Sequence, residues 1–306
     1  MTAAPDRPGL LRRWLIFTNE RYSFAEHVPF IFCLALGNAV VACRLTATPF
    51  SPRTFALGAL VYLLFFFRLR CFDEVKDYDT DLRVNPTRPL ARGLLTVGDV
   101  KTMFVAVTVL EFVLVWLASP AALGAHAVAV AYSYLMYKEF FIGKQLAPHL
   151  TTYGLTHTVV STLLAYSVFA QMTGLPLTRL PVPLLVFGLS SWAIFNLFEF
   201  ARKTFAPDEE RPGVPSYTTR FGIPGAALLS LSQVAAAVAL VAYLAGRGEV
   251  FSGRDVAVQA GVAAFPLLAA LDFARRPARP SAKRFRTVCA LYLIVFFALL
   301  SFQGWF

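Results

Sequence analysis

Residues 68–93 read RLRCFDEVKDYDTDLRVNPTRPLARG, and the stretch passes from apolar to acidic and then to basic and proline-marked. If the preceding apolar run continues as a helix, Asp73, Asp77 and Asp81 share a face, as do Glu74, Asp77 and Asp81. Like charges stacked in this way repel one another. A divalent cation would relieve the repulsion, because Mg²⁺ binds oxygen ligands, usually one or two carboxylates plus substrate phosphates. A solvated acidic loop beside a membrane helix is the alternative interpretation.

The composition is that of an integral membrane protein. Hydrophobic residues make up 57% of the 306 residues and charged residues 15%, against ~25% charged in a typical soluble domain. The mean hydropathy is +0.61. The net charge of +10 is explained by the excess of Lys and Arg that membrane proteins carry on their cytoplasmic side. We therefore expect a lipid bilayer as partner and no nucleic acid.

Nine apolar segments predict nine transmembrane helices. They lie at about 24–42, 55–72, 100–117, 121–137, 150–169, 182–200, 226–244, 256–271 and 287–302. We expect one all-α transmembrane domain over residues 21–306, preceded by a polar, basic tail or interfacial helix over residues 1–20.

The basic residues support this topology. With the N-terminus in the cytoplasm, all but five of the 28 Lys and Arg residues fall in cytoplasmic segments. The five exceptions are Arg44, Arg53, Arg179, Arg247 and Arg254. The pattern predicts a multi-pass protein of the cell membrane with both of its acidic clusters on the cytoplasmic side.

The second acidic cluster follows the sixth predicted span, where residues 199–222 read EFARKTFAPDEERPGVPSYTTRFG. On a continuing helix, Glu199, Arg202 and Lys203 share a face, whereas Asp208 and Glu209 follow Pro207 in a loop. Two carboxylate clusters facing each other across a cavity could hold metal ions that bind a diphosphate, while Arg and Lys bind its remaining oxygens. Two ordinary cytoplasmic loops are the alternative.

The chain resembles the UbiA superfamily of intramembrane prenyltransferases over about residues 20–300. That family carries an Asn-Asp-x-x-Asp-x-x-x-Asp motif after its second helix, where this chain has DEVKDYDTD at residues 73–81, followed by RPL at 88–90 and Gly93. A second acidic motif follows the family's sixth helix. The first motif departs from the family pattern at Asp73 and Glu74, and the second lacks the usual Asp-x-x-x-Asp.

The resemblance implies an all-α bundle of nine transmembrane helices and an Mg²⁺-dependent transfer of an isoprenoid chain. The substrates would be a prenyl diphosphate and an aromatic or other lipophilic acceptor. Expected metal ligands are Asp73, Glu74, Asp77, Asp81, Glu199, Asp208 and Glu209; expected diphosphate contacts are Arg68, Arg70, Arg88, Arg202 and Lys203; expected catalytic residues are Asp77, Asp81 and Lys138. For Arg68 and Arg70, pairing with Asp73 and Asp77 is the alternative to a diphosphate contact.

Polar residues inside predicted spans are further candidates, because a polar group at membrane depth is costly. They are Asn38, Glu111, His157 and Asn196. Two rival functions remain open from the sequence. One is a transferase that moves a phosphorylated sugar onto a lipid phosphate, which the same metal site would serve. The other is a transporter or permease, which would need acidic residues near the membrane midplane.

Overall fold

The computed structural model describes residues 8–302, and this part of the chain contains helices and no β-strand. The α-helices are α1 (Leu10–Arg21), α2 (Phe24–Leu45), α3 (Pro52–Lys76), α4 (Tyr78–Val84), α5 (Val97–Ala118), α6 (Leu123–Tyr137), α7 (Gly143–Leu146), α8 (Leu150–Thr158), α9 (Val160–Thr173), α10 (Val182–Arg202), α11 (Tyr217–Gly246), α12 (Gly253–Arg275) and α13 (Arg279–Phe302). Short 3₁₀ turns lie at Pro120–Ala122, Glu139–Phe141, Leu177–Arg179 and Pro207–Glu209.

Seven helices within residues 8–302 are long and apolar enough to cross a membrane, which makes the chain a multi-pass membrane protein. They are α2 (from His27), α3, α5, α10, α11, α12 and α13. The predicted count of nine is not confirmed. At the fourth predicted span α6 has only 15 residues, and the fifth is divided into α8 and α9. At that division, the Thr158 hydroxyl donates to the Gly154 carbonyl (3.0 Å).

Side-chain caps fix where several spans begin, because the first N–H groups of a helix lack partners within it. Ser51 accepts a hydrogen bond from the Thr54 N–H (3.3 Å) at the start of α3, and Pro52 occupies the first turn. Capping boxes open α5 at Thr96, α11 at Ser216 and α12 at Ser252.

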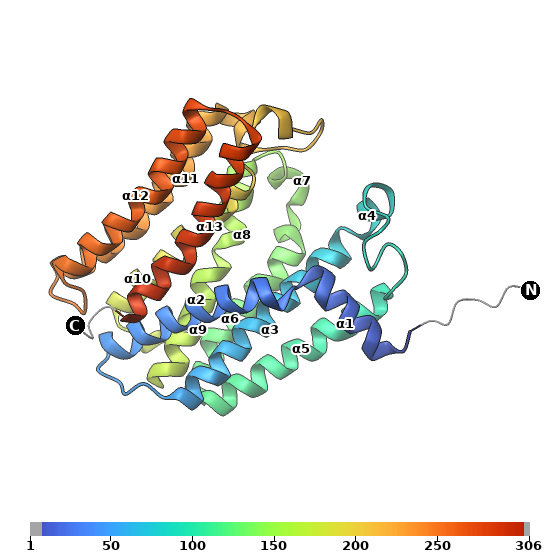
Figure 1. The fold of residues 1–306 in the computed structure, drawn as a ribbon. Coiled ribbons are helices and arrows are strands. Elements are labelled where there is room, and N and C mark those ends of the chain that lie inside the picture. Colours follow the sequence, from blue (N-terminus) through green and yellow to red (C-terminus); the bar gives the residue numbers. More distant parts are fainter. Residues whose placement is uncertain (1–7, 303–306) are drawn as a thin grey trace, which may run out of the picture.

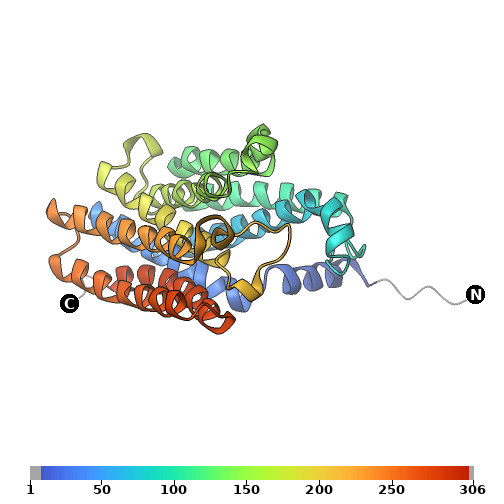
Figure 2. The ribbon, with the colours of Figure 1, turned by 90° about the horizontal axis from the view of Figure 1, so that it is seen from above.

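The bundle consists of long helices packed side by side (Figure 1). Helix α2 packs against α3, α9 and α13, α3 also packs against α5, and α10 packs against α9 and α11. Viewed from above, α11–α13 lie on one side and α5–α9 on the other (Figure 2). Buried aliphatic and aromatic side chains fill the main core, including Leu184, Phe187, Phe285 and Phe296.

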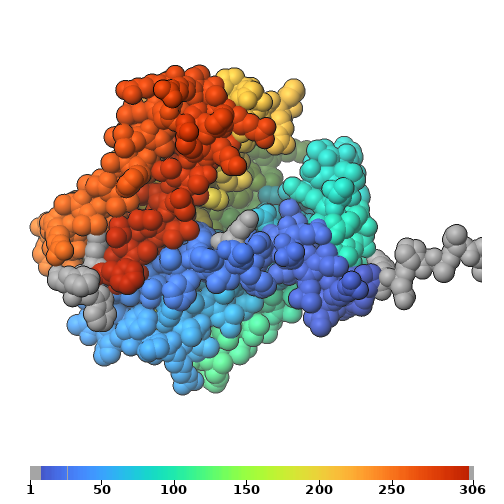
Figure 3. Space-filling model, in the orientation of Figure 1, coloured from blue at the N-terminus to red at the C-terminus, as the bar shows by residue number. Residues whose placement is uncertain are grey.

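Helix α1 packs against the end of α3, in the region predicted as a tail or interfacial helix. Phe17 is fully buried, and its ring lies 6.3 Å from that of Phe67. The segment after α4 folds back over this helix through a left-handed turn at Gly93, and Arg92 binds Glu20 (2.8 Å). The space-filling view shows a recess between this segment and the segments that follow α10 (Figure 3).

Candidate functional site

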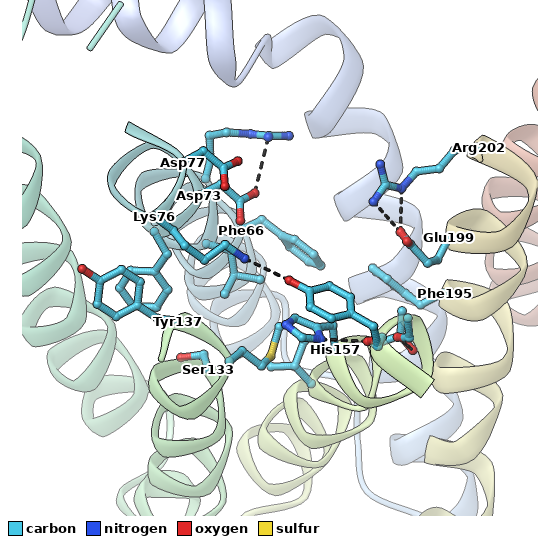
Figure 4. Close-up of a pocket in the computed structure, with 18 of the residues that line it drawn as sticks. Phe66, Asp73, Lys76, Asp77, Ser133, Tyr137, His157, Phe195, Glu199 and Arg202 are labelled. Atoms are coloured by element: carbon cyan, nitrogen blue, oxygen red, sulfur yellow. Dashed lines mark hydrogen bonds and ion pairs between the residues drawn. The ribbon is translucent and has the colours of Figure 1, made fainter. Parts of the chain in front are cut away.

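A cavity of about 500 Å³ lies where the C-terminal ends of α3 and α10 face each other. Its walls hold six basic and three acidic side chains: Arg21, Arg70, Lys76, Arg88, Arg202 and Lys203, with Asp73, Asp77 and Glu199. Apolar side chains continue the walls, among them Phe66, Leu69, Met136, Val160 and Phe195. The two acidic clusters of the sequence therefore contribute to one cavity, with α3 on one wall and α10 on the opposite wall (Figure 4).

Asp73 and Asp77 form the carboxylate pair of the α3 wall, one helical turn apart. Asp73 is half-exposed and lies 3.5 Å from Arg70 Nη1. Burial raises the pKa of Asp77 above its ordinary value; the negative charges of Asp73 and Asp81 add to the rise, against the opposite pull of Lys76 and Arg88. Asp77 is therefore a partly buried carboxylate with two acidic and two basic neighbours.

Glu199 faces these residues from α10, held by two cations of its own helix. Its Oε2 accepts a hydrogen bond from Arg202 Nε (2.6 Å), and its Oε1 lies 2.9 Å from Lys203 Nζ. This is the shared helix face predicted from the spacing of the three residues. Arg202 is half-exposed, so an anionic ligand can reach its guanidinium from the cavity.

Three predicted site residues near α3 lie outside the cavity lining. Arg68 is fully buried and donates two hydrogen bonds to Glu111, 2.9 and 3.0 Å long. Glu74 is buried and pairs with Arg21. Asp81 is buried and accepts a hydrogen bond from Arg88 Nη1 (2.6 Å).

The helix break at Asp77 explains part of this arrangement. Helix α3 ends at Lys76 and a separate helix, α4, begins at Tyr78. The predicted common face therefore holds for Asp73 and Asp77, but Asp81 belongs to the next helix. Glu74 is rotated by about 100° from Asp73 around α3, which turns it toward α1.

The rest of the second cluster also lies outside the cavity lining. Glu209 accepts hydrogen bonds from both Nη atoms of Arg286 (2.7 and 2.8 Å), and this contact lowers the pKa of Glu209. Asp208 is exposed in the 3₁₀ turn. Lys138 likewise lies outside the lining, with its Nζ 5.0 Å from the ring centroid of Tyr137.

Lys76, Arg21 and Tyr153 line the cavity although the sequence did not single them out. Lys76 Nζ donates a hydrogen bond to the Tyr153 hydroxyl (3.1 Å) and lies 3.6 Å from Glu139. The Tyr153 ring stacks on His157, with centroids 4.0 Å apart. Lys76 had a local signal, because it lies inside the acidic motif itself, whereas Arg21 and Tyr153 reach the site only through packing of α1 and α8.

The carboxylates of the cavity fit an Mg²⁺ ion that is bound by both protein and substrate. They do not fit a metal site in which every ligand comes from the protein. Within residues 8–302, no three His, Cys, Asp or Glu side chains are arranged to hold a metal ion. Mg²⁺ usually takes one or two carboxylates and completes its shell with water and substrate phosphates. Asp73 and Asp77, one helical turn apart on the α3 wall, provide that number of carboxylates.

The basic side chains fit a polyanionic ligand. Three of the six form ion pairs with carboxylates that lie outside the cavity lining: Arg21 with Glu74, Lys76 with Glu139, and Arg88 with Asp81. Such contacts fix the position of each cation before a ligand arrives. Cations arranged around an anion form short, charge-assisted hydrogen bonds, which are the strong ones in proteins.

Comparisons with known proteins agree with this architecture. The model of the UbiA prenyltransferase family matches residues 30–300. The chain is similar to the structure of a UbiA homolog from Aeropyrum pernix K1, at 19% identity and a TM-score of 0.61, covering 91% of this chain and 98% of that one. It is also similar to a digeranylgeranylglyceryl phosphate synthase structure, at 18% identity and a TM-score of 0.60, covering 95% and 96%.

A third similar structure is that of a UbiA homolog from Archaeoglobus fulgidus bound to GPP and Mg²⁺, at 16% identity and a TM-score of 0.58, covering 94% of this chain and 99% of that one. No curated protein matches the chain. At these identities the similar structures establish the fold, and the predicted all-α, UbiA-like architecture is confirmed.

Proposed function

Because the chain belongs to the UbiA prenyltransferase family, we propose that it transfers an isoprenoid chain from a prenyl diphosphate to a lipophilic acceptor within the membrane. The observation that carries the proposal is the single cavity in which charged walls continue into apolar ones. An amphiphile with a diphosphate head and a hydrocarbon tail matches both parts. The homolog from Archaeoglobus fulgidus, bound to GPP and Mg²⁺, supports this class of donor.

In this proposal Asp73 and Asp77 hold Mg²⁺, which when bound stabilises the negative charge that develops on a departing diphosphate. Arg70, Lys76 and Arg202 line the cavity around the same space and bind the diphosphate oxygens, together with Arg88 and Lys203. The roles expected for Arg68, Glu74, Asp81, Lys138, Asp208 and Glu209 are not carried into the proposal, because these side chains lie outside the cavity lining.

The reaction breaks the bond between the first prenyl carbon and the diphosphate oxygen. A new bond forms between that carbon and an atom of the acceptor, which gives up a proton, and the diphosphate leaves with the electron pair of the broken bond. The apolar walls contribute by excluding water, which would otherwise capture the electron-deficient prenyl carbon. Leu69, Met136 and Val160 are the lining residues to which we assign this part.

The proposal also has an orientation. The bias of Lys and Arg toward one set of loops supports a cytoplasmic N-terminus and a cavity that opens toward the cytoplasm. A prenyl diphosphate would then enter with its charged head at the aqueous face and its tail toward the bundle interior.

The test is turnover by the purified protein in detergent with labelled geranyl, farnesyl and geranylgeranyl diphosphates, Mg²⁺ and a panel of hydroxylated aromatic acceptors. We expect diphosphate release together with an alkylated product, abolished in Asp77→Ala. Asp79→Ala is the matched control, because Asp79 belongs to the same acidic motif but is exposed and lies outside the cavity lining. Equal turnover in the two variants, or full turnover with all metal chelated, would refute the assigned roles.

A further inference from the structure

Aromatic rings from three different helices meet at the apolar part of the cavity. Phe66 of α3 and Phe195 of α10 both line the cavity, and their rings stack with centroids 5.7 Å apart and planes at 11°. Phe30 of α2 lies against both rings, at 6.1 Å from Phe66 and 5.7 Å from Phe195. We call Phe30, Phe66 and Phe195 the aromatic floor.

The aromatic floor rests on well-packed protein. Beyond Phe66 on the same helix lie Tyr62 and Phe65, both fully buried, with ring centroids 6.4 and 6.5 Å from that of Phe66. All three floor residues pack against the main hydrophobic core. Because protein interiors are close-packed, a ligand that extends past the floor must displace side chains and not merely fill empty space.

The depth of the floor below the charged groups follows from helix geometry. Phe66 precedes Asp73 by seven residues on α3, which is about 10 Å along the axis, and Phe195 precedes Glu199 by four residues on α10, which is about 6 Å. Figure 4 shows the two rings between the carboxylates of the opposite walls. The floor is therefore close to the site proposed for the diphosphate.

This depth corresponds to a short hydrocarbon tail. Each isoprene unit adds four carbon–carbon bonds of about 1.5 Å, or about 5 Å when extended. A chain of two units spans about 10 Å and reaches the floor, whereas chains of three and four units exceed that depth by about 5 and 10 Å.

From this geometry we infer that the aromatic floor limits the donor to a short prenyl chain of about two isoprene units, with Phe66 and Phe195 as the specificity-determining residues. The inference rests on the proposed prenyltransferase function and adds the class of donor to it. Phe66 and Phe195 act on chain length and not on the chemical step, since they lie one to two helical turns from the carboxylates.

The test measures binding and needs no acceptor. Dissociation constants for geranyl, farnesyl and geranylgeranyl diphosphates are measured with Mg²⁺ for the purified protein and for the double variant Phe66→Ala/Phe195→Ala. We expect the unmodified protein to bind the geranyl compound at least about tenfold more tightly than the geranylgeranyl compound, because forcing extra methylenes into a packed site is unfavourable. The double variant should reduce this ratio to about threefold or less, or reverse it.

Two further variants keep the result interpretable. Phe198→Ala is the matched control, since Phe198 is a phenylalanine on the same helix as Phe195 but is exposed and lies outside the cavity lining; its ratio should equal that of the unmodified protein. Phe66→Leu preserves most of the packing and should give a ratio between those of the unmodified protein and the double variant. It replaces the double variant in the test if that variant does not fold.

The outcomes separate the inference from the function on which it rests. Equal affinity of the unmodified protein for all three chain lengths would overturn the aromatic floor as a limit while leaving the proposed function standing. An unchanged ratio in the double variant, or in Phe66→Leu where the double variant does not fold, would do the same. Failure of all three compounds to bind with Mg²⁺ would instead refute the proposed function, and the inference with it.

Discussion

Replacing the buried partner of Arg68 should destabilise the bundle strongly. Arg68 and Glu111 are both fully buried and joined by two hydrogen bonds, and Arg68 Nη1 also donates to the Ser133 hydroxyl (2.6 Å). In Glu111→Leu the guanidinium keeps its charge but loses its carboxylate. Removing one member of a buried ion pair costs about 3–5 kcal/mol, because the remaining charge is uncompensated. At about 2 °C per kcal/mol for a chain of this size, the melting temperature should fall by roughly 6–10 °C.

The double variant Arg68→Met/Glu111→Leu distinguishes a charge effect from a packing effect. Replacing both members of a buried pair by apolar residues of similar volume is often neutral, so the double variant should recover most of the lost stability. Thermal unfolding of the unmodified protein, Arg68→Met, Glu111→Leu and the double variant in one detergent gives the coupling energy of the pair. The double variant should also bind geranyl diphosphate within about threefold of the unmodified protein, because Arg68 lies outside the cavity lining.

Two results would refute this reasoning. One is additivity, in which the double variant is as unstable as the sum of the two single variants. The other is a double variant that is stable but no longer binds the diphosphate. That result would return Arg68 to the role of diphosphate contact, which the sequence suggested and which its burial against Glu111 argues against.

Three further predictions concern charged groups. Lys76→Met should weaken Mg²⁺-dependent binding of geranyl diphosphate by about 10- to 150-fold, which corresponds to the free energy of one charge-assisted hydrogen bond. Lys138→Met should change this affinity by less than about threefold. Isothermal titration calorimetry of both variants measures the two effects. Because the pKa of Asp77 is raised, protons should compete with Mg²⁺ for this carboxylate at a pH above the usual aspartate pKa of about 3.9. The affinity for geranyl diphosphate with Mg²⁺ should therefore fall on acidification more steeply in the unmodified protein than in Asp77→Asn. Contact with Arg286 lowers the pKa of Glu209, so the stabilisation is fully present above the ordinary glutamate pKa of about 4.3 and is lost as the pH falls through the lowered value. The difference in melting temperature between the unmodified protein and Glu209→Gln should therefore be constant from pH 7 to pH 5 and should shrink as the pH falls below about 4.3. A difference that does not shrink on acidification would contradict this.

The local sequence pattern was enough to predict the fold class and several of the charged residues that line the cavity. Long apolar runs between polar loops gave the all-α bundle, because hydropathy over about 20 residues is a strong signal. The acidic motif and Glu199 with its two neighbouring cations were visible from helical spacing alone. The count of spans could not be settled in this way, since a run of adequate hydropathy at 150–169 is divided between α8 and α9.

Tertiary packing decided which charged residues reach the cavity. Glu74 turns toward Arg21 because α1 packs there, and Glu209 is bound by Arg286, 77 residues further along the chain. Tyr153 enters the site from α8 through Lys76. None of these partnerships has a signature in local spacing, so Glu74 and Glu209 were predicted to be metal ligands in the same way as Asp73 and Asp77.

The most direct test of the central claim is the binding of inorganic diphosphate to the purified protein, with and without Mg²⁺, in variants of the two opposite walls. The account predicts Mg²⁺-dependent binding. The affinity for diphosphate should fall at least about tenfold in Asp77→Ala on α3 and in Arg202→Ala on α10, and should be unchanged in Asp79→Ala. Binding that is unchanged when Mg²⁺ is chelated, or that depends on only one of the two walls, would contradict it.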